Sequence, residues 1–150
     1  MSKPPTDQSL CDIIEQSLKQ QAKVTRILVV EDDLDLARVL TMMFERHGIE
    51  AYHAQTGQEA IQLSQRVLPD LLLLDLVLSE GDGYVVAEWL RQHDRLRQLP
   101  LVVYSAKDLD KAERDRLALG PTEFFTKGRI TPEEFEERVI ALLNRIVPKP

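Results

Sequence analysis

From residue 26 onward, short apolar runs alternate with stretches in which apolar residues recur at helical spacing. This alternation is typical of βα units, which build a parallel sheet with helices on both faces. The run "LLLL" at residues 71 to 74 is apolar at every position, as expected of a strand buried on both sides. Such runs predict five strands, at residues 26 to 30, 50 to 54, 71 to 75, 101 to 105 and 123 to 127.

Between these runs, apolar side chains three or four residues apart predict amphipathic helices, each with one buried stripe. Gly48 marks the end of the first helix, Thr56 with Glu59 resembles a capping box for the second, and "TPEE" at 131 to 134 marks the start of the last. The four stripes are Leu36, Val39, Leu40, Met43 and Phe44; Ala60, Ile61, Ser64, Val67 and Leu68; Val85, Val86, Trp89 and Leu90; and Phe135, Val139, Leu142 and Leu143.

Residues 1 to 25 form an N-terminal extension outside this βα pattern. Leu10, Ile13, Ile14 and Leu18 recur at helical spacing and predict an extra helix over residues 8 to 22. Its narrow apolar stripe favours a short helix that packs on its own domain or frays in solvent. A dimer-forming helix and the remnant of a longer parent chain are the alternatives.

Composition narrows the class of partner. The 150 residues, 43% of them hydrophobic, suffice for one domain with a substantial core. The net charge of −6, from 19 basic and 25 acidic residues, argues against direct binding to nucleic acid, which requires clustered cations. Cys11 is the single cysteine, and neither a leader sequence nor an apolar run of ~20 residues appears. We therefore expect a cytoplasmic protein without a membrane partner.

Polar side chains follow the strands at the edge where an open parallel sheet binds its ligands, the carboxyl ends of the strands. An acid in such a position is usually a turn residue or a helix cap, and a lone lysine is usually a solvated surface charge. Here, however, such residues follow four different strands at spacings of about one βα unit. They are Glu31, Asp32 and Asp33, then Asp75, Ser105 and Lys127.

Three carboxylates gathered at this edge require a counter-charge. At ~5 Å they would repel by ~3 kcal/mol per pair at an effective dielectric constant near 20. Lys127 supplies one positive charge, and oxygen ligands from Glu31, Asp32 and Asp75 suit Mg²⁺. An aspartate beside a metal ion and an ammonium group is poised to attack phosphorus, which makes Asp75 the candidate nucleophile.

Four motifs resemble the receiver domain of two-component response regulators, and the resemblance covers residues 26 to 147. It implies a flavodoxin-like fold with five parallel strands in the order 2-1-3-4-5. The motifs are "ILVVEDD" at 27 to 33, "PDLLLLDLVLSEGDG" at 69 to 83, "VVYSAKD" at 102 to 108 and "FFTKG" at 124 to 128.

The resemblance also implies roles for individual residues. Glu31 and Asp32 would hold Mg²⁺ together with Asp75 and the backbone carbonyl of Val77. A histidine kinase or a phosphotransfer protein would phosphorylate Asp75.

On the same resemblance, Ser105 would bind one phosphoryl oxygen and Lys127 another, and Phe124 would change rotamer with Ser105 on activation. Three residues depart from the family pattern. Ser79 and Gly128 replace the usual prolines, and Phe124 replaces the usual tyrosine and lacks its hydroxyl. Gly128 puts the path of the loop after Lys127 in doubt.

The expected function is a phospho-acceptor signalling module that catalyses only its own phosphorylation and slow dephosphorylation. It would act on an unknown downstream protein or through self-dimerisation. Two alternatives belong to other classes. A metal-dependent phosphohydrolase with an aspartyl nucleophile would need an acid two residues after Asp75, where Val77 stands. A binding module that is never phosphorylated would be expected to lack an acid or the lysine.

Two side chains flank the approach of water to the phosphoryl group in receiver domains, here Val77 and Lys107. Val77 offers no hydrogen bond to water, and Lys107 is able to cover the phosphoryl group, so we expect slow hydrolysis. The alternative is that Lys107 points into solvent and Val77 packs on its own loop.

Overall fold

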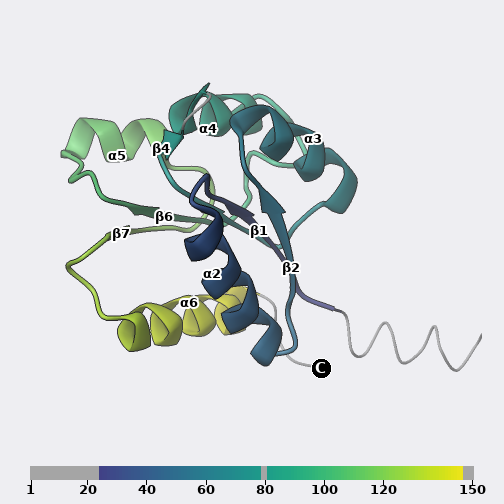
Figure 1. The fold of residues 1–150 in the computed structure, drawn as a ribbon. Coiled ribbons are helices and arrows are strands. Elements are labelled where there is room, and N and C mark those ends of the chain that lie inside the picture. Colours follow the sequence, from purple (N-terminus) through teal and green to yellow (C-terminus); the bar gives the residue numbers. More distant parts are fainter. Residues whose placement is uncertain (1–23, 79–80, 147–150) are drawn as a thin grey trace, which may run out of the picture.

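The computed structural model describes residues 24–78 and 81–146 and shows a parallel sheet between two layers of helices (Figure 1). The sheet order is β2-β1-β3-β6-β7, which confirms the predicted order 2-1-3-4-5 for the five parallel strands. The extra helix predicted over residues 8 to 22 lies outside the described residues. The strands, with the labels of Figure 1, are β1 (Arg26–Val30), β2 (Glu50–Ala54), β3 (Leu71–Leu74), β6 (Leu101–Ser105) and β7 (Thr122–Thr126).

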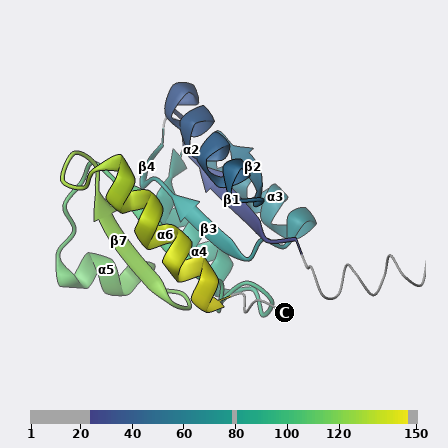
Figure 2. The same ribbon diagram turned by 90° about the horizontal axis from the view of Figure 1, so that it is seen from below.

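Helices cover both faces of the sheet. One group of helices lies over one face and a second group over the other (Figure 1), and the view from below shows the second group lying in front of the sheet (Figure 2). In the described part of the chain, no helix has the length and apolarity needed to cross a lipid bilayer. The first group is α3 (Gly57–Val67), α4 (Gly83–Arg91) and α5 (Lys111–Leu117); the second is α2 (Leu34–Arg46) and α6 (Pro132–Ile146).

The central strand β3 supplies both halves of the core. Leu72 and Leu74 pack in the cluster under α3, α4 and α5, and Leu71 and Leu73 pack in the cluster under α2 and α6. All four side chains are buried. Each stabilises the fold by about 1.5–3 kcal/mol relative to an exposed leucine, so the strand is held from both sides.

Helix ends largely match the sequence prediction. Gly48 follows the C-cap of α2 at φ +75°, and the Thr131 hydroxyl accepts the N–H of Glu134 at 3.1 Å at the start of α6. The Thr56 hydroxyl accepts the N–H of Glu59 at 3.1 Å. The Glu59 carboxylate accepts the N–H of Gln55, one residue before the cap, and completes a variant of the predicted capping box.

Three local features differ from the prediction. Val39 and Val85 are exposed, because each lies at the margin of its helical stripe rather than over the core. The predicted loop after β3 contains a short antiparallel pair of strands, β4 (Val77–Leu78) and β5 (Gly81–Asp82). Helix α5 was not predicted, because Leu117 is its only buried residue and it has no apolar stripe.

Candidate functional site: an acidic pocket at the strand ends

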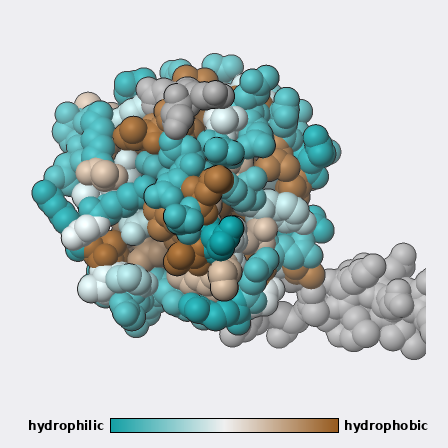
Figure 3. All heavy atoms as spheres, viewed as in Figure 1, coloured by the Kyte–Doolittle hydropathy of each residue, from teal (hydrophilic) through white to brown (hydrophobic). Residues whose placement is uncertain are grey.

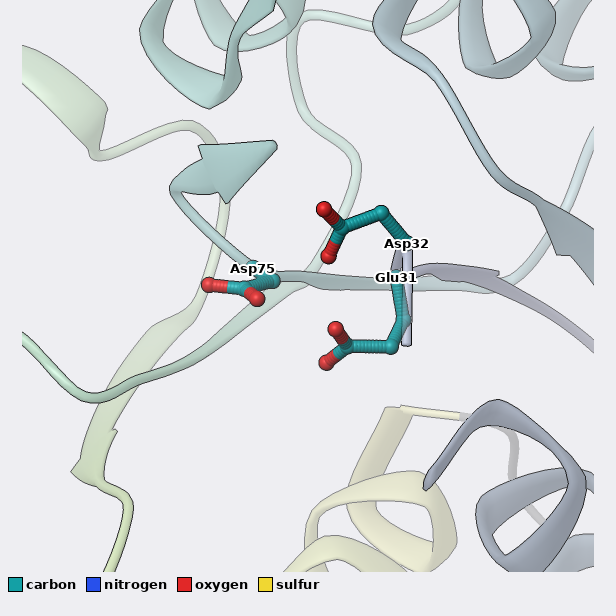
Figure 4. A group of neighbouring side chains, drawn as sticks. All are labelled: Glu31, Asp32 and Asp75. Carbon is teal, nitrogen blue, oxygen red and sulfur yellow. The ribbon is translucent and has the colours of Figure 1, made fainter. Parts of the chain in front are cut away.

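The strand register brings the acids together. Val30 of β1 is level with Leu74 of β3, and the N–H of Asp75 donates to the carbonyl of Val30 at 3.0 Å. The next residues, Glu31 and Asp75, therefore leave the sheet side by side. Carboxylate oxygens of Glu31, Asp32 and Asp75 lie within 4.8 Å of one another, and Figure 4 shows the three groups gathered at the end of the strands.

Lys127 closes the pocket from the end of β7. Its Nζ donates to Glu31 Oε1 at 2.9 Å and to Asp75 Oδ2 at 3.1 Å. Its own N–H donates to the Ser105 carbonyl at 2.8 Å, which extends the β6–β7 pairing by one residue. Gly128 follows at φ +84°, a conformation that L side chains rarely adopt. The loop with glycine in place of proline thus still delivers Lys127 to the acids.

Backbone groups fix the second carboxylate oxygens of Asp75 and Glu31. The N–H of Val77 donates to Asp75 Oδ1 at 3.1 Å, and the N–H of Asp33 donates to Glu31 Oε2 at 3.2 Å. His53 Nε2 lies 2.6 Å from the carbonyl oxygen of Glu31 and joins β2 to the site. These contacts hold the carboxylates in place before any ligand binds.

The electrostatics of the pocket are dominated by burial. Glu31 is 2% exposed and Asp75 is 6% exposed. Burial raises the pKa of Glu31 to about 7, the charge of Asp75 adds to the effect, and the hydrogen bond from Lys127 opposes it. Burial also disfavours the charge on Lys127, but its bonds to Glu31 and Asp75 outweigh this cost and raise its pKa. One lysine does not balance three carboxylates.

The donor set suits a hard divalent cation. Glu31, Asp32 and Asp75 offer only oxygen ligands, at a spacing that a single ion can bridge, and Mg²⁺ prefers such ligands with water completing its shell. Val77 lies in β4 beside this group, and its carbonyl remains a predicted ligand. The pocket could therefore hold the metal that the sequence predicts.

The two predicted switch residues lie on neighbouring strands. Ser105 is buried at the end of β6, and its Oγ accepts the N–H of Lys107 at 3.4 Å. Phe124 of β7 is level with Val103 and packs, partly buried, on the cluster under α3, α4 and α5. The Arg114 guanidinium lies 5.4 Å from the centre of its ring.

Some residues have roles that the motif analysis did not assign. Asp33 caps α2 by accepting the N–H groups of Asp35 and Leu36, so its side chain is committed to the helix. Lys107 pairs with Glu113 Oε2 at 2.7 Å. The spacing of Asp110 and Glu113, an acid three residues after a cap residue, is the signal that would have revealed this part of the site.

Fold and site together define a class. In the order β2-β1-β3, the chain places β2 on one side of β1 and β3 on the other, so the strand order reverses between β1 and β3. Open α/β sheets bind ligands in the crevice at such a topological switch point. The acids of this pocket follow these two strands. The protein is therefore an α/β domain with a candidate metal and phosphate site at its topological switch point.

The family model described as "Response regulator receiver domain" matches residues 27–140. The chain belongs to the response regulator receiver domain family, which confirms the resemblance found in its motifs. It is thus a phospho-acceptor module of two-component signal transduction.

Curated relatives include two transcriptional regulators. The chain is 34% identical over 120 residues to the alkaline phosphatase synthesis transcriptional regulatory protein PhoP of Bacillus subtilis, covering 80% of this chain and 49% of that protein. It is 36% identical over 119 residues to the transcriptional regulatory protein SrrA of Staphylococcus aureus, covering 79% and 48%. The chain spans about half the length of these relatives.

Solved structures with the same fold come from a response regulator and from a histidine kinase. A two-component response regulator from Clostridium difficile superposes with a TM-score of 0.70 at 27% identity, covering 82% of this chain and 98% of that one. The signal receiver domain of a signal transduction histidine kinase from Syntrophus aciditrophicus gives 0.67 at 27% identity, covering 85% and 95%.

Proposed function

We propose that Asp75 accepts the phosphoryl group and that Glu31, Asp32 and Asp75 hold Mg²⁺ beside it, with the Val77 carbonyl as a further ligand. One observation carries the proposal: the Asp75 carboxylate lies among the other acids while Lys127 donates to its Oδ2. The nucleophile, the candidate metal ligands and a cation thus meet at a single point.

The chemistry is a displacement at phosphorus. An Asp75 oxygen forms a P–O bond while the P–N bond to the donor imidazole breaks and the imidazole leaves with the bonding electron pair. Bound Mg²⁺ would neutralise charge on the transferring oxygens. Lys127 pairs with another phosphoryl oxygen, and the Ser105 hydroxyl donates to a third. Hydrolysis removes the phosphoryl group by a second displacement: the oxygen of water bonds to phosphorus, the P–O bond to Asp75 breaks, and inorganic phosphate leaves with the protons of that water shared between it and solvent.

The donor is a histidine kinase or a phosphotransfer protein, which must bring its histidine to the mouth of the pocket. Leu34, Val39 and Met42 of α2 are exposed, as is Val77 in the loop after Asp75. Figure 3 shows hydrophobic side chains on the surface over α2. An apolar surface next to the acids supports docking of a protein donor.

The signal to a downstream partner would pass through the side of the pocket formed by β6 and β7. We assign the switch to Ser105 and Phe124, because they lie on adjacent strands and both border the face that carries α5. Movement there would alter the surface offered to a downstream protein or to a second copy of the chain. PhoP and SrrA are named as transcriptional regulators, but the match covers about half of each. For this domain we propose no direct contact with nucleic acid.

Phosphate uptake from acetyl phosphate with Mg²⁺ tests the proposal. The parent should form a hydroxylamine-sensitive phosphoprotein, and Asp75→Asn should not. Asp32→Ala should lose Mg²⁺ binding. Asp108→Asn is the matched control, because Asp108 is an exposed carboxylate paired with Arg129 at the same end of the sheet. Uptake by Asp75→Asn equal to that of the parent would refute the assignment.

A metal-dependent phosphohydrolase remains less favoured than a signalling role. Such an enzyme needs a general acid two residues after its nucleophile, and the exposed apolar Val77 cannot donate a proton. The family match supports the receiver instead.

A further inference from the structure

One carboxylate joins three segments beside the acidic pocket. Glu113 Oε1 accepts the backbone N–H of Asp110, the N-cap of α5, at 3.2 Å. Glu113 Oε2 accepts the Tyr84 hydroxyl at 3.0 Å and lies 2.7 Å from Lys107 Nζ. Tyr84 belongs to the first turn of α4, and Lys107 belongs to the loop between β6 and α5. Glu113 therefore ties that loop to both helices.

This loop begins at the phosphorylation site. β6 runs beside β3, so that Asp75 and Ser105 leave neighbouring strands at the same edge of the sheet. Two residues further on, the N–H of Lys107 still donates to Ser105 Oγ at 3.4 Å. The backbone of Lys107 thus stays close to the pocket, while its ammonium group is directed to Glu113.

Phosphorylation changes the charge balance of the pocket. With Mg²⁺ present, the ion and Lys127 together balance the charges of Glu31, Asp32 and Asp75. A phosphoryl group on Asp75 raises the negative charge there to nearly two and adds acceptor oxygens. The loaded pocket then carries an excess of about one negative charge, which a second cation would neutralise.

We propose that Glu113 is a positioning residue that holds Lys107 away from Asp75 in the resting protein, and that the phosphoryl group draws Lys107 from Glu113. The inference rests on the proposed phosphorylation of Asp75. Transfer of Lys107 removes one of the three bonds to Glu113 and loosens the link between α4, the loop and α5. Loading of the pocket would in this way be reported at α5.

The Lys107–Glu113 ion pair is strong enough to form in the unphosphorylated protein, but weak enough for Lys107 to leave Glu113 for a phosphoryl group. The hydrogen bond from Lys107, followed by those from Asp110 and Tyr84, lowers the pKa of Glu113 to about 2. The Glu113 carboxylate is therefore charged throughout the neutral pH range. The Lys107 side chain is 49% exposed, however, and exposed ion pairs change an equilibrium by only about two- to fivefold. A phosphoryl group inside the pocket is a stronger partner than that.

Binding of beryllofluoride, a phosphoryl mimic, at saturating Mg²⁺ tests the exchange in the full chain. Glu113→Gln keeps an oxygen for the Asp110 N–H but gives up the charge that retains Lys107. We expect its dissociation constant for beryllofluoride to fall about two- to fivefold. Lys107→Gln should weaken binding by a similar factor, and the double variant should match Lys107→Gln, since Glu113 acts only through Lys107.

Mg²⁺ affinity measured without beryllofluoride distinguishes a positioning role of Glu113 from a general distortion of the pocket by the substitutions. It should be the same in all four proteins, whereas a distorted pocket would change it too. Glu123→Gln is the matched control, because Glu123 is also a part-buried glutamate in an ion pair, with Arg145 at 3.3 Å, and should bind as the parent does. An unchanged Glu113→Gln, or an effect that persists without Lys107, overturns the inference. A parent that shows no Mg²⁺-dependent binding overturns the proposed function and this inference with it.

Discussion

Lys127 Nζ lies 2.9 Å from Glu31 Oε1, although 96 residues separate the two in the chain. The carboxylate is buried and the lysine is mostly so. The cost of removing both charged groups from water offsets much of the electrostatic attraction between them, so such a pair stabilises the fold by less than its short distance suggests. Burial of Glu31, together with the nearby charge of Asp75, outweighs the hydrogen bond from Lys127 and raises the pKa of Glu31 to about 7.

Mg²⁺ affinity should rise with pH across neutrality. Because Glu31 holds its proton up to about pH 7, the proton competes with the ion below that pH. We expect affinity to fall about tenfold between pH 8 and pH 6, in line with protonation of one ligand. Isothermal titration with MgCl₂ at the two pH values measures it. A pH-independent affinity would show that Glu31 is not a ligand or is already ionised.

The same shift fixes the sign of a stability effect without metal. Between pH 4.5 and about 7, the folded protein keeps the Glu31 proton that the unfolded chain has lost, so stability should fall as pH rises through this window. Urea unfolding in the presence of a chelator measures the trend. Glu31→Gln should flatten it, and a slope that survives this substitution would have another origin.

Lys127→Met should destabilise the metal-free protein. Removal of the ammonium leaves Glu31 and Asp75 buried without their cation, at a cost of about 2 to 4 kcal/mol. Mg²⁺ replaces part of the lost charge and should therefore raise the melting temperature more in this variant than in the parent.

The control for Lys127 is Lys111→Met, at the exposed first position of α5. It removes one positive charge from an exposed side chain outside the acidic group and should leave stability and the Mg²⁺ effect nearly unchanged. Equal losses in the two variants would mean that net charge, rather than the pocket, sets the stability.

Gly83→Ala should be far more costly than Gly57→Ala, although each glycine opens a helix. A Cβ at Gly83 would lie 2.7 Å from the Leu76 Cα and 2.8 Å from the Asp75 carbonyl oxygen, both of them backbone atoms. A Cβ at Gly57 would meet only the Val86 methyl group, at 3.2 Å. We expect a loss of about 1–3 kcal/mol for Gly83→Ala in denaturant unfolding and less than half of that for Gly57→Ala.

Removal of residues 1 to 23 should leave phosphorylation intact. The proposed site uses residues between Glu31 and Lys127, all of which the five parallel strands position. Acetyl phosphate labelling of the truncated chain, with circular dichroism to confirm folding, measures this. A folded but unlabelled chain would place part of the site in the extension.

The sequence was sufficient for the strands and for the pocket, because both follow from strong local signals. A fully buried strand such as β3 is apolar at every position, so its sequence is easily identified as a strand. A residue at its carboxyl end must lie at the edge of the sheet where ligands bind. Asp75 and Glu31 could therefore be assigned to a common edge from the sequence alone. Ser105 and Lys127 followed from the same reasoning.

Side-chain partners within the loops could not be predicted in this way. Lys107 was expected either to cover the phosphoryl group or to point into solvent, and neither expectation named Glu113, the residue with which it pairs in the structure. That contact depends on where α5 begins, and α5 lacks the apolar stripe on which the prediction relied. Asp33 was grouped with the pocket acids, although its position before a helix also fitted a cap.

Strand β3 has one more consequence, for hydrogen exchange. Its residues pair with β1 on one side and with β6 on the other, and every side chain is buried in one of the two clusters. Amides in such a position exchange only when the whole domain opens, whereas loops open at much lower free energy. Asp75 is the residue directly after this strand. A phosphoryl group on Asp75, as proposed, would thus be anchored to a segment that we expect to exchange slowly, while the surrounding loops rearrange many times during the lifetime of the phosphorylated state.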